Sequence, residues 1–184
     1  EMKAIQQVKE EHEGVKVMLA VLERVCRKLE ETRHLDQKHF EKILEFLKVF
    51  VDRCHHGKEE ELLFPALAVA GVPKDGPIRV MLQEHEVGRK YIRTMSDAFA
   101  GFASGDPSAS GEIAKSGQDY IALLKDHIEK ENNVLFAMAD RLLPVEKQDE
   151  LLEGFEKIEE ERIGIGKHEE FHHLLEKLST AYLK

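Results

Sequence analysis

The stretch HHGKEEELLFP, residues 55–65, places two histidines and three glutamates directly before an apolar segment. Its pattern, H-x-x-K-E-x-x-x-L-F, occurs again in DHIEKENNVLF, residues 126–136. The two copies share a histidine followed four residues later by a glutamate, namely His55 and Glu59, then His127 and Glu131. A solvated helix face has no need for the same spacing in two places. The repeat therefore predicts that these polar residues belong to the core.

The similarity extends upstream of both copies. EEHEGVK at residues 10–16 resembles QEHEVGR at residues 83–89, and each contains one histidine, His12 or His85. These histidines precede the histidine of the H-x-x-x-E pattern by 43 and 42 residues (12 to 55 and 85 to 127). The chain from about residue 5 to residue 140 is therefore interpreted as two copies of one unit.

Apolar residues recur at steps of three and four along four segments, which is the spacing of one face of an α-helix. They are Ile5, Val8, Val15, Leu19, Leu22, Cys26 and Leu29 in the first segment, Phe40, Leu44, Leu47, Val51, Leu62 and Ala66 in the second, Ile78, Met81, Ile92, Met95 and Phe99 in the third, and Tyr120, Leu124, Val134 and Met138 in the fourth. The histidines and glutamates of the repeat fill the gaps in these series. They are therefore predicted to face the core.

Residues typical of turns separate the segments. The breaks are RHLD at 33–36, AGVPKDGP at 70–77, GFASGDPSASG at 101–111 and LLPVEKQ from residue 142. Pro77 suits the first turn of a helix, and Asp36 or Pro144 suits the start of another.

Four long helices with short connections predict an all-α fold, an up-down-up-down four-helix bundle over residues 1–143. Two further helices, at about residues 147–161 and 167–183, flank a GIG hinge at 164–166. They are predicted to form a C-terminal extension, residues 144–184, that packs on the bundle.

Composition and charge argue against several classes of partner. A net charge of −9 without a basic stripe disfavours nucleic acid and anionic membrane surfaces. No apolar run approaches the roughly 20 residues of a membrane span, and the N-terminal residues lack the apolar region of a signal peptide, so a cytoplasmic protein is expected. Cys26 and Cys54 are too few for a disulfide framework and are expected to be reduced packing residues.

A core lined by histidines and glutamates needs a positive partner, because an isolated buried carboxylate loses several kcal/mol of hydration. Lysine is a poor candidate. Lys58 and Lys130 each directly precede a glutamate, and adjacent residues of a helix do not face each other, so both are expected on the outer face. A metal centre is predicted instead, with the ligands His12, His55, Glu59, His85, His127 and Glu131.

The ligand types indicate which metal is expected. A histidine and a glutamate four residues apart lie on one helix face, so each pattern offers an imidazole nitrogen and a carboxylate to a common point. Mixed imidazole and carboxylate ligands suit iron, with zinc or manganese as lesser candidates, whereas structural zinc favours thiolates and calcium favours oxygens. The ligand count fits two iron ions with an oxo or hydroxo bridge. At least one position then stays open for a small ligand.

The sequence resembles the hemerythrin-like (HHE cation-binding) family, four-helix bundles that hold a non-haem di-iron centre. The resemblance covers about residues 5 to 140 and rests on the repeated motifs. HHGKEEELLFP, GPIRVMLQEHE and HIEKENNVLF are also similar to segments of bacterial di-iron proteins that repair iron centres after nitrosative or oxidative stress. The resemblance implies the same six ligands, with both glutamates bridging the irons.

Two positions depart from these relatives. Oxygen-carrying hemerythrins show an H-x-x-x-H pattern on the third helix, whereas the residue four after His85 is Arg89. Arg89 is interpreted either as a group that stabilises a reduced oxygen species or as a salt-bridge partner at the bundle edge, and the second reading is preferred. The repair proteins take an additional histidine from a region after the first helix, so His34 is the first candidate for a seventh ligand.

Residues 168–172, HEEFH, formally match the H-E-x-x-H motif of zinc peptidases. A short motif in a chain with ten histidines carries little weight, and peptidase activity is not predicted. A docked C-terminal helix could instead present His168, His172 or Glu160 to the metal centre.

The remaining polar residues near the motifs are expected at the surface. They are His39, His56, His173, Glu60 and Glu61. For Glu60 the alternative is a hydrogen bond to a ligating histidine.

The leading hypothesis for function is a cytoplasmic di-iron protein that binds or reacts with O2, peroxide or NO at an open iron position. Whether it is an enzyme is left open, with peroxide or NO reduction as the candidate activities. The alternatives are an iron or oxygen sensor whose C-terminal helices a partner recognises, and an iron-centre repair protein. The expected partner is a small diatomic ligand or peroxide, and a homodimer is left open.

Overall fold

Every regular element in residues 3–184, the part of the chain that this computed structural model describes, is a helix. The first long helix is α1 (Ala4–Thr32), and the third is α4 (Pro77–Ala103). The second helix, residues 37–69, is continuous and comprises α2 (Gln37–Glu45), the π-helical stretches η1 (Phe46–His56) and η2 (Glu59–Leu63), and α3 (Phe64–Val69). The fourth helix, residues 109–142, comprises α5 (Ala109–Lys130), the π-helical η3 (Glu131–Leu135) and α6 (Phe136–Leu142). Two more helices follow, α7 (Val145–Arg162) and α8 (Lys167–Tyr182).

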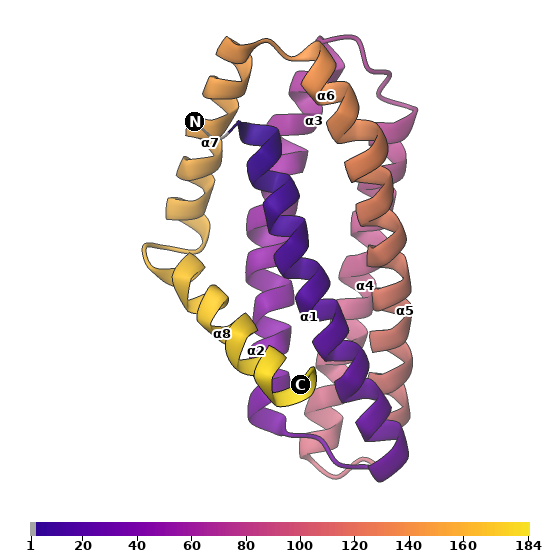
Figure 1. The fold of residues 1–184 in the computed structure, drawn as a ribbon. Coiled ribbons are helices and arrows are strands. Elements are labelled where there is room, and N and C mark those ends of the chain that lie inside the picture. Colours follow the sequence, from indigo (N-terminus) through magenta and orange to yellow (C-terminus); the bar gives the residue numbers. More distant parts are fainter. Residues whose placement is uncertain (1–2) are drawn as a thin grey trace.

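The four long helices lie side by side in an elongated bundle, and α7 and α8 run along one side of it (Figure 1). Helix α5 packs against both α4 and α1. Helix α7 contacts α1 and both π-helical stretches of the second helix, while α8 contacts α1 and η1. The predicted all-α fold class is confirmed. Residues 1 and 2 of the predicted bundle segment lie outside the described residues.

Local sequence explains where several helices begin. The Asp36 carboxylate accepts a hydrogen bond from the His39 amide at 3.0 Å and caps α2, while Pro77 lies in the first turn of α4. Between α7 and α8, Gly164 and Gly166 adopt positive φ angles of 85° and 83°. Such angles cost little only for glycine, so the turn predicted at GIG depends on both glycines.

The connection between α4 and α5 is shorter than the turn-rich stretch predicts. Residues 101–103 and 109–111 are helical, which leaves only residues 104–108 outside a helix. Within this loop the Asp106 carboxylate accepts hydrogen bonds from the amide and the hydroxyl of Ser108, at 2.9 and 2.8 Å. This local turn lets the chain reverse in few residues, so the flanking residues extend the helices.

The second and fourth helices contain π-helical stretches at the repeated pattern, and η2 and η3 each begin at its glutamate. A π turn contains more residues than an α turn, so each following side chain points to a different face than an α-helix predicts. After the second glutamate the buried residue is Leu135, whereas Val134, predicted to face the core, is exposed. The first copy shows the same shift, with Leu63 buried and Leu62 only partly buried. The prediction for Val134 is therefore wrong because of the π turn.

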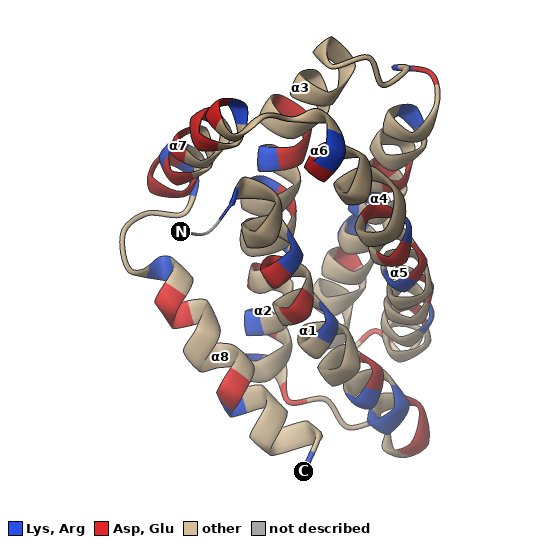
Figure 2. Cartoon of the chain, turned by 45° about the horizontal axis from the view of Figure 1, so that its top comes forward, with Lys and Arg blue, Asp and Glu red and all other residues tan. Residues whose placement is uncertain are grey.

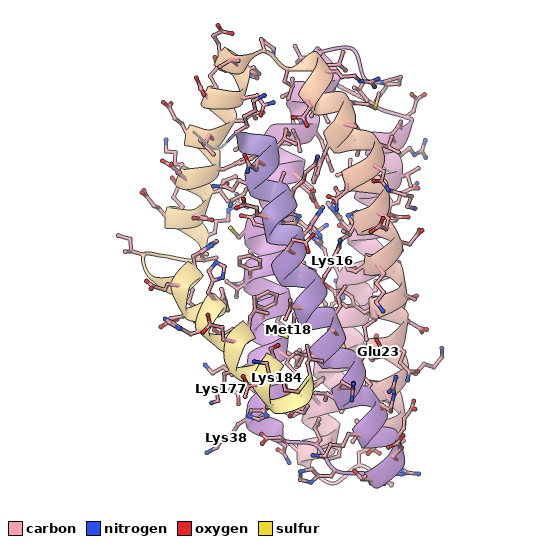
Figure 3. All side chains as sticks on the ribbon, viewed as in Figure 1. Lys16, Met18, Glu23, Lys38, Lys177 and Lys184 are labelled. Atoms are coloured by element: carbon pink, nitrogen blue, oxygen red, sulfur yellow. The ribbon has the colours of Figure 1, made fainter. Side chains whose placement is uncertain are left out.

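The apolar core consists of two clusters separated by a polar layer. One cluster contains Val15 to Leu29 of α1 and the buried face of α8, and the other contains Ile5, Phe64 and Phe155 from the opposite end of the bundle. Met18 of α1 is fully buried in the first cluster, while Lys16 and Glu23 of the same helix reach solvent (Figure 3). The histidines and glutamates of the repeat lie between the two clusters.

Acidic and basic residues are mixed along the helices, as Figure 2 shows for α1, α5, α7 and α8. Many form ion pairs on a helix surface, such as Lys115 with Asp119 at 3.0 Å and Arg27 with Glu23 at 3.2 Å. Exposed pairs of this kind contribute little to stability. Among the described residues, no helix is both long and apolar enough to cross a membrane.

Candidate metal centre

The six residues of the repeated motifs are buried and come from all four long helices. They are His12 of α1, His55 of η1, Glu59 of η2, His85 of α4, His127 of α5 and Glu131 of η3. Because the second and fourth helices each contribute a histidine and a glutamate, two H-x-x-x-E pairs meet in the polar layer between the apolar clusters. The structure therefore brings all six predicted residues together.

The imidazole nitrogens of these residues point at the two carboxylates. The Oε1 atom of Glu131 lies 3.1 Å from His12 Nε2 and 3.2 Å from His127 Nε2. Glu59 lies 3.6 Å from His55 Nε2 through Oε2 and 3.3 Å from His85 Nε2 through Oε1. Each carboxylate thus faces imidazoles from two different helices.

Potential ligand atoms within 4.8 Å of one another form two groups of four buried residues. One group is His12, His55, Glu59 and Glu131, and the other is His56, Glu59, His85 and His127. Glu59 belongs to both groups. The donor set is therefore divided into two adjacent sites that share one carboxylate.

Several of these atoms have no hydrogen-bond partner among residues 3–184. Both oxygens of Glu59, both oxygens of Glu131, and the Nε2 atoms of His12 and His55 are buried and unsatisfied. Such groups in a core are costly, because each has lost its hydration without a replacement. All four residues belong to the first ligand group, whose ligand atoms lie within 4.8 Å of one another, so a cation bound there would satisfy these atoms. The residues present therefore fit a metal centre.

The other ring nitrogen of each histidine is held by a hydrogen bond. Nδ1 of His55 donates to Glu11 at 2.8 Å, Nδ1 of His85 to Glu60 at 2.7 Å, Nδ1 of His127 to Glu84 at 2.9 Å, and Nδ1 of His12 to the amide oxygen of Asn132 at 2.8 Å. A carboxylate at Nδ1 fixes the tautomer and leaves Nε2 free as a ligand, which is usual for histidines that bind metals. Glu60 thus follows the alternative prediction of a hydrogen bond to a ligating histidine.

The two central carboxylates differ in pKa. Burial, reinforced by the charge of Glu131, raises the pKa of Glu59 well above its usual value. Burial alone would also raise the pKa of Glu131, but the charge of His127 and the close approach of the His12 and His127 imidazoles hold it well below its usual value. Without a cation, ionising both carboxylates side by side is therefore unfavourable. A metal ion would remove this conflict.

His56 was predicted at the surface, and this prediction is wrong. The residue is buried, its ring stacks on His85 with centroids 3.8 Å apart, and it belongs to the second ligand group. Its Nδ1 lies 3.3 Å from Asp52, which leaves Nε2 free. Burial and the neighbouring imidazoles lower its pKa well below the usual value, so the ring is neutral. The only signal in the sequence was its position beside His55.

Replacing His56 with glutamine is expected to weaken binding of a metal ion at the second ligand group by about 10- to 100-fold and to leave the first group unchanged. The reason is that His56 belongs to one ligand group only. Anaerobic titration with Fe2+ would separate the two affinities. His34→Gln serves as the control and should behave as wild type. Identical titrations of the His56 variant and wild type would contradict a ligand role for His56.

Lys58 was predicted on the outer face and is instead fully buried, with no exposed surface. Its Nζ donates to Glu11 at 2.6 Å and to Glu159 of α7 at 2.8 Å. Burial alone would raise the pKa of Glu11, but the hydrogen bond from His55 and the charge of Lys58 outweigh it and lower the pKa. The prediction failed because α7 covers this face of the second helix, which periodicity within one helix does not reveal.

Lys130, the matching residue of the second copy, is only partly buried and pairs with Glu84 and Asp126. Since Glu84 also accepts the hydrogen bond from His127, Lys130 supports the centre from its outer edge. The two copies of the pattern therefore place their lysines in different surroundings.

The additional ligand candidates do not join the centre. His34 is exposed in the loop after α1, and the 20 residues from His12 to Thr32 span about 30 Å of helix. Glu160 is exposed, and its neighbour Glu159 faces Lys58 instead. His168 lies outside both ligand groups, with Nδ1 3.3 Å from Glu159. The ligand roles considered for these residues are therefore corrected.

Arg89 forms salt bridges, as the preferred interpretation of this residue predicts. Its guanidinium donates to Asp52 at 2.8 Å and to Glu60 at 2.6 Å, and these contacts lie at the edge of the second ligand group.

Cys26 and Cys54 are free, buried thiols, and burial raises the pKa of each to about 12. Both cysteines thus pack as predicted.

Comparison with known proteins identifies the family. The family model of the hemerythrin HHE cation binding domain matches residues 3–139. The chain belongs to this family, which confirms the resemblance seen in the motifs. It is 27% identical over 155 residues to an uncharacterized protein of Mycobacterium bovis and to an uncharacterized protein of Mycobacterium tuberculosis, a match that covers 84% of this chain. The chain spans 60% of the length of these relatives. No solved structure gives a significant match.

Proposed function

We propose that the protein holds two iron ions in its core and binds or reacts with O2, peroxide or NO at an open iron position. The observation that carries this proposal is the pair of buried ligand groups that share Glu59. Among the described residues, the carboxylates of Glu59 and Glu131 and the Nε2 atoms of His12 and His55 have no hydrogen-bond partner. Imidazole mixed with carboxylate suits iron, and zinc or manganese are lesser candidates. Membership of a cation-binding family supports a metal in this position.

Each ligand group would hold one ion. We infer that His12 and His55 serve one ion and that His56, His85 and His127 serve the other. Glu59 and Glu131 would bridge or flank both. Each of the four long helices, in the up-down-up-down order predicted for them, would supply at least one imidazole. A bound iron pair would supply redox chemistry and a vacant coordination position for a small molecule.

The chain itself contributes positioning, charge and exclusion of water. The acceptors at Nδ1 hold the four imidazoles in one tautomer and orientation. Two carboxylates would offset part of the metal charge in a site that has little access to solvent. The apolar clusters on both sides, with Phe136 stacked on His12 at 5.2 Å, favour a small, weakly polar ligand.

Sensing is the second candidate function, and it is favoured by a series of contacts that connects the metal centre to α7. Glu11 links the ligand His55 to Lys58, and Lys58 links Glu11 to Glu159 of α7. Metal occupancy would therefore influence how α7 packs on the bundle. A sensor predicts loss of helix order when iron is chelated, whereas an enzyme keeps its fold. Iron-centre repair remains an alternative function. It is supported by the similarity of the motif segments to those of the repair proteins, and it would use the same redox chemistry of the iron pair.

The test of this proposal is to purify the protein anaerobically, load it with iron, reduce it, and expose it separately to O2, peroxide and NO. We expect absorption changes with at least one of the three. A slowly fading band would favour a carrier or sensor, and catalytic consumption of peroxide or NO would favour an enzyme. Protein loaded with zinc is the control and should not respond. Unchanged spectra of the reduced iron protein with all three would contradict the proposal.

A further inference from the structure

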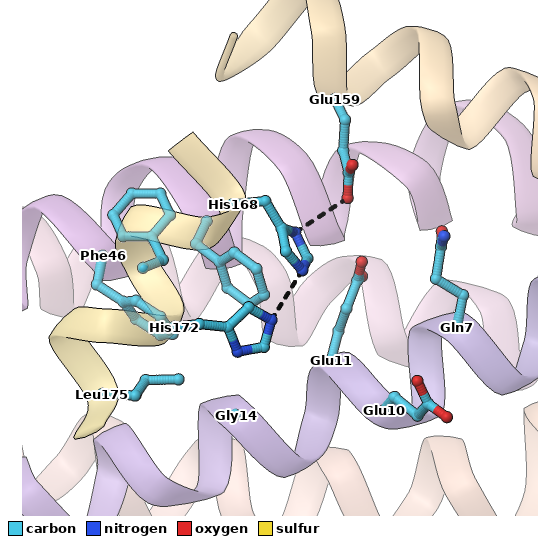
Figure 4. Close-up of a pocket in the computed structure, with 11 residues that line it drawn as sticks. Gln7, Glu10, Glu11, Gly14, Phe46, Glu159, His168, His172 and Leu175 are labelled. Carbon is cyan, nitrogen blue, oxygen red and sulfur yellow. Dashed lines mark hydrogen bonds and ion pairs between the residues drawn. The ribbon is translucent and has the colours of Figure 1, made fainter. Parts of the chain in front are cut away.

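A cavity of about 260 Å³ lies between α1, the second helix and the α7–α8 pair, outside the two ligand groups (Figure 4). Its apolar wall includes Phe46, Phe50 and Phe171, and its polar wall includes carboxylates from α1 and α7. His168 and His172, the two histidines of HEEFH, project into it from α8 (Figure 4). The predicted metal centre does not use these two histidines.

The geometry of this histidine pair repeats a pair within the metal centre. His168 Nε2 and His172 Nε2 lie 3.0 Å apart, with ring centroids at 4.7 Å and an interplanar angle of 58°. In the centre, His85 Nε2 and His127 Nε2 lie 3.1 Å apart, with centroids at 4.8 Å and an angle of 55°. In both pairs the two Nε2 atoms lie within hydrogen-bond distance of each other, so a cation that binds both nitrogens would take the place of the proton between them.

The orientation of His168 supports this parallel. Its Nδ1 lies 3.3 Å from an oxygen of Glu159, a longer contact than the 2.8 Å hydrogen bond between Nδ1 of His55 and Glu11 in the centre. A carboxylate at Nδ1 favours the tautomer with a free Nε2 and increases the basicity of the ring as a ligand. Two histidines four residues apart on one helix face are also the spacing with which helices bind zinc.

We propose that His168 and His172 bind a divalent transition-metal cation of the zinc class, at a site separate from the core centre. With nitrogen–zinc distances of about 2.0–2.1 Å and tetrahedral angles, the two nitrogens would lie about 3.3 Å apart. The observed 3.0 Å differs from this value by only about 0.3 Å. The site lies at the surface, so cations reach it without opening the core.

Glu10 is the available third ligand. Glu11 and Glu159 also line the cavity, but both accept hydrogen bonds from the buried Lys58. Glu10 lines the same cavity, is exposed, and forms no hydrogen bond or ion pair within the described residues, which makes it the carboxylate that the cation could recruit. Water would complete the coordination.

The site is proposed for binding and not for peptide hydrolysis. In H-E-x-x-H peptidases the glutamate activates a water molecule on the metal. Glu169, the glutamate of this motif, does not line the cavity, its side chain is exposed, and its carboxylate lies 3.9 Å from Nε2 of His173. It therefore lies away from the pair that would bind the cation.

The experiment begins with protein whose core metal has been loaded, freed of excess metal and quantified. Zn2+ is then titrated and followed by calorimetry, and total metal is measured after gel filtration. We expect one additional Zn2+ per chain, with the core metal retained. His172→Gln should weaken this binding by at least about tenfold, and Glu10→Gln should weaken it to a smaller degree.

His173→Gln is the matched control, because His173 neighbours His172 on α8 but its side chain is highly exposed and does not line the cavity. It should bind Zn2+ like wild type. His172 is exposed as well, so its replacement should leave the fold intact, which circular dichroism would verify. Equal Zn2+ binding by the His172 variant, or no additional Zn2+ in wild type, would overturn the proposal. Neither result depends on the identity or reactivity of the core metal.

Discussion

Replacing Lys58 with methionine is expected to lower the free energy of unfolding by about 3–5 kcal/mol. The Lys58 ammonium is fully buried between Glu11 and Glu159, with Nζ–oxygen distances of 2.6 and 2.8 Å. Methionine has a similar length but no charge, so the variant would leave a buried carboxylate at Glu11 without its cation. Urea denaturation of the iron-loaded proteins measures the difference.

Lys130→Met is the matched control, because Lys130 occupies the same position in the second copy of the pattern. Its side chain is 37% exposed and pairs with Glu84 and Asp126 near solvent. Partly exposed ion pairs contribute about 0–1 kcal/mol, so this variant should be only slightly destabilised. Equal losses in the two variants would contradict the buried role assigned to Lys58.

Replacing Glu59 with glutamine is expected to remove at least half of the bound iron. Glu59 belongs to both ligand groups, and the neutral amide supplies neither the negative charge nor the second ligand oxygen of a bridge. Elemental analysis of iron-loaded, gel-filtered protein measures the loss. Circular dichroism should show a folded variant, since removing a buried carboxylate also removes a source of repulsion with Glu131.

Glu61→Gln is the control for this experiment. Glu61 lies two residues further along the same π-helical stretch, but its side chain is 51% exposed and pairs with Arg162 of α7. Its replacement should leave the iron content unchanged. Full iron occupancy in Glu59→Gln would show that this carboxylate does not join the two sites.

The sequence alone predicts much of the fold and the six residues that gather in the core. Heptad-like spacing of apolar residues defines a helix whatever its neighbours are, and turn residues mark its ends. The spacing of four between His55 and Glu59 and between His127 and Glu131 keeps each pair on one helix face. These features are local in sequence, so they were accessible without a structure.

The errors arise where local spacing is not sufficient. The π-helical turns shift the residues after each glutamate, which is why Val134 is exposed and Leu135 buried. The spacing of apolar residues along the second helix predicts that His56 and Lys58 are exposed to solvent. Helix α4 covers His56 through the stacking with His85, and Glu159 of α7 covers Lys58. Such contacts depend on how distant segments pack, and the spacing within one helix carries no information about them.

We propose that the core holds two iron ions that share Glu59. The most direct test is a crystal structure of the iron-loaded protein with anomalous scattering measured at the iron absorption edge. We predict two anomalous peaks about 3.5–4 Å apart, one beside His12 and His55 and the other beside His85 and His127, with Glu59 contacting both. A single peak, or peaks that lie away from Glu59, would contradict the claim.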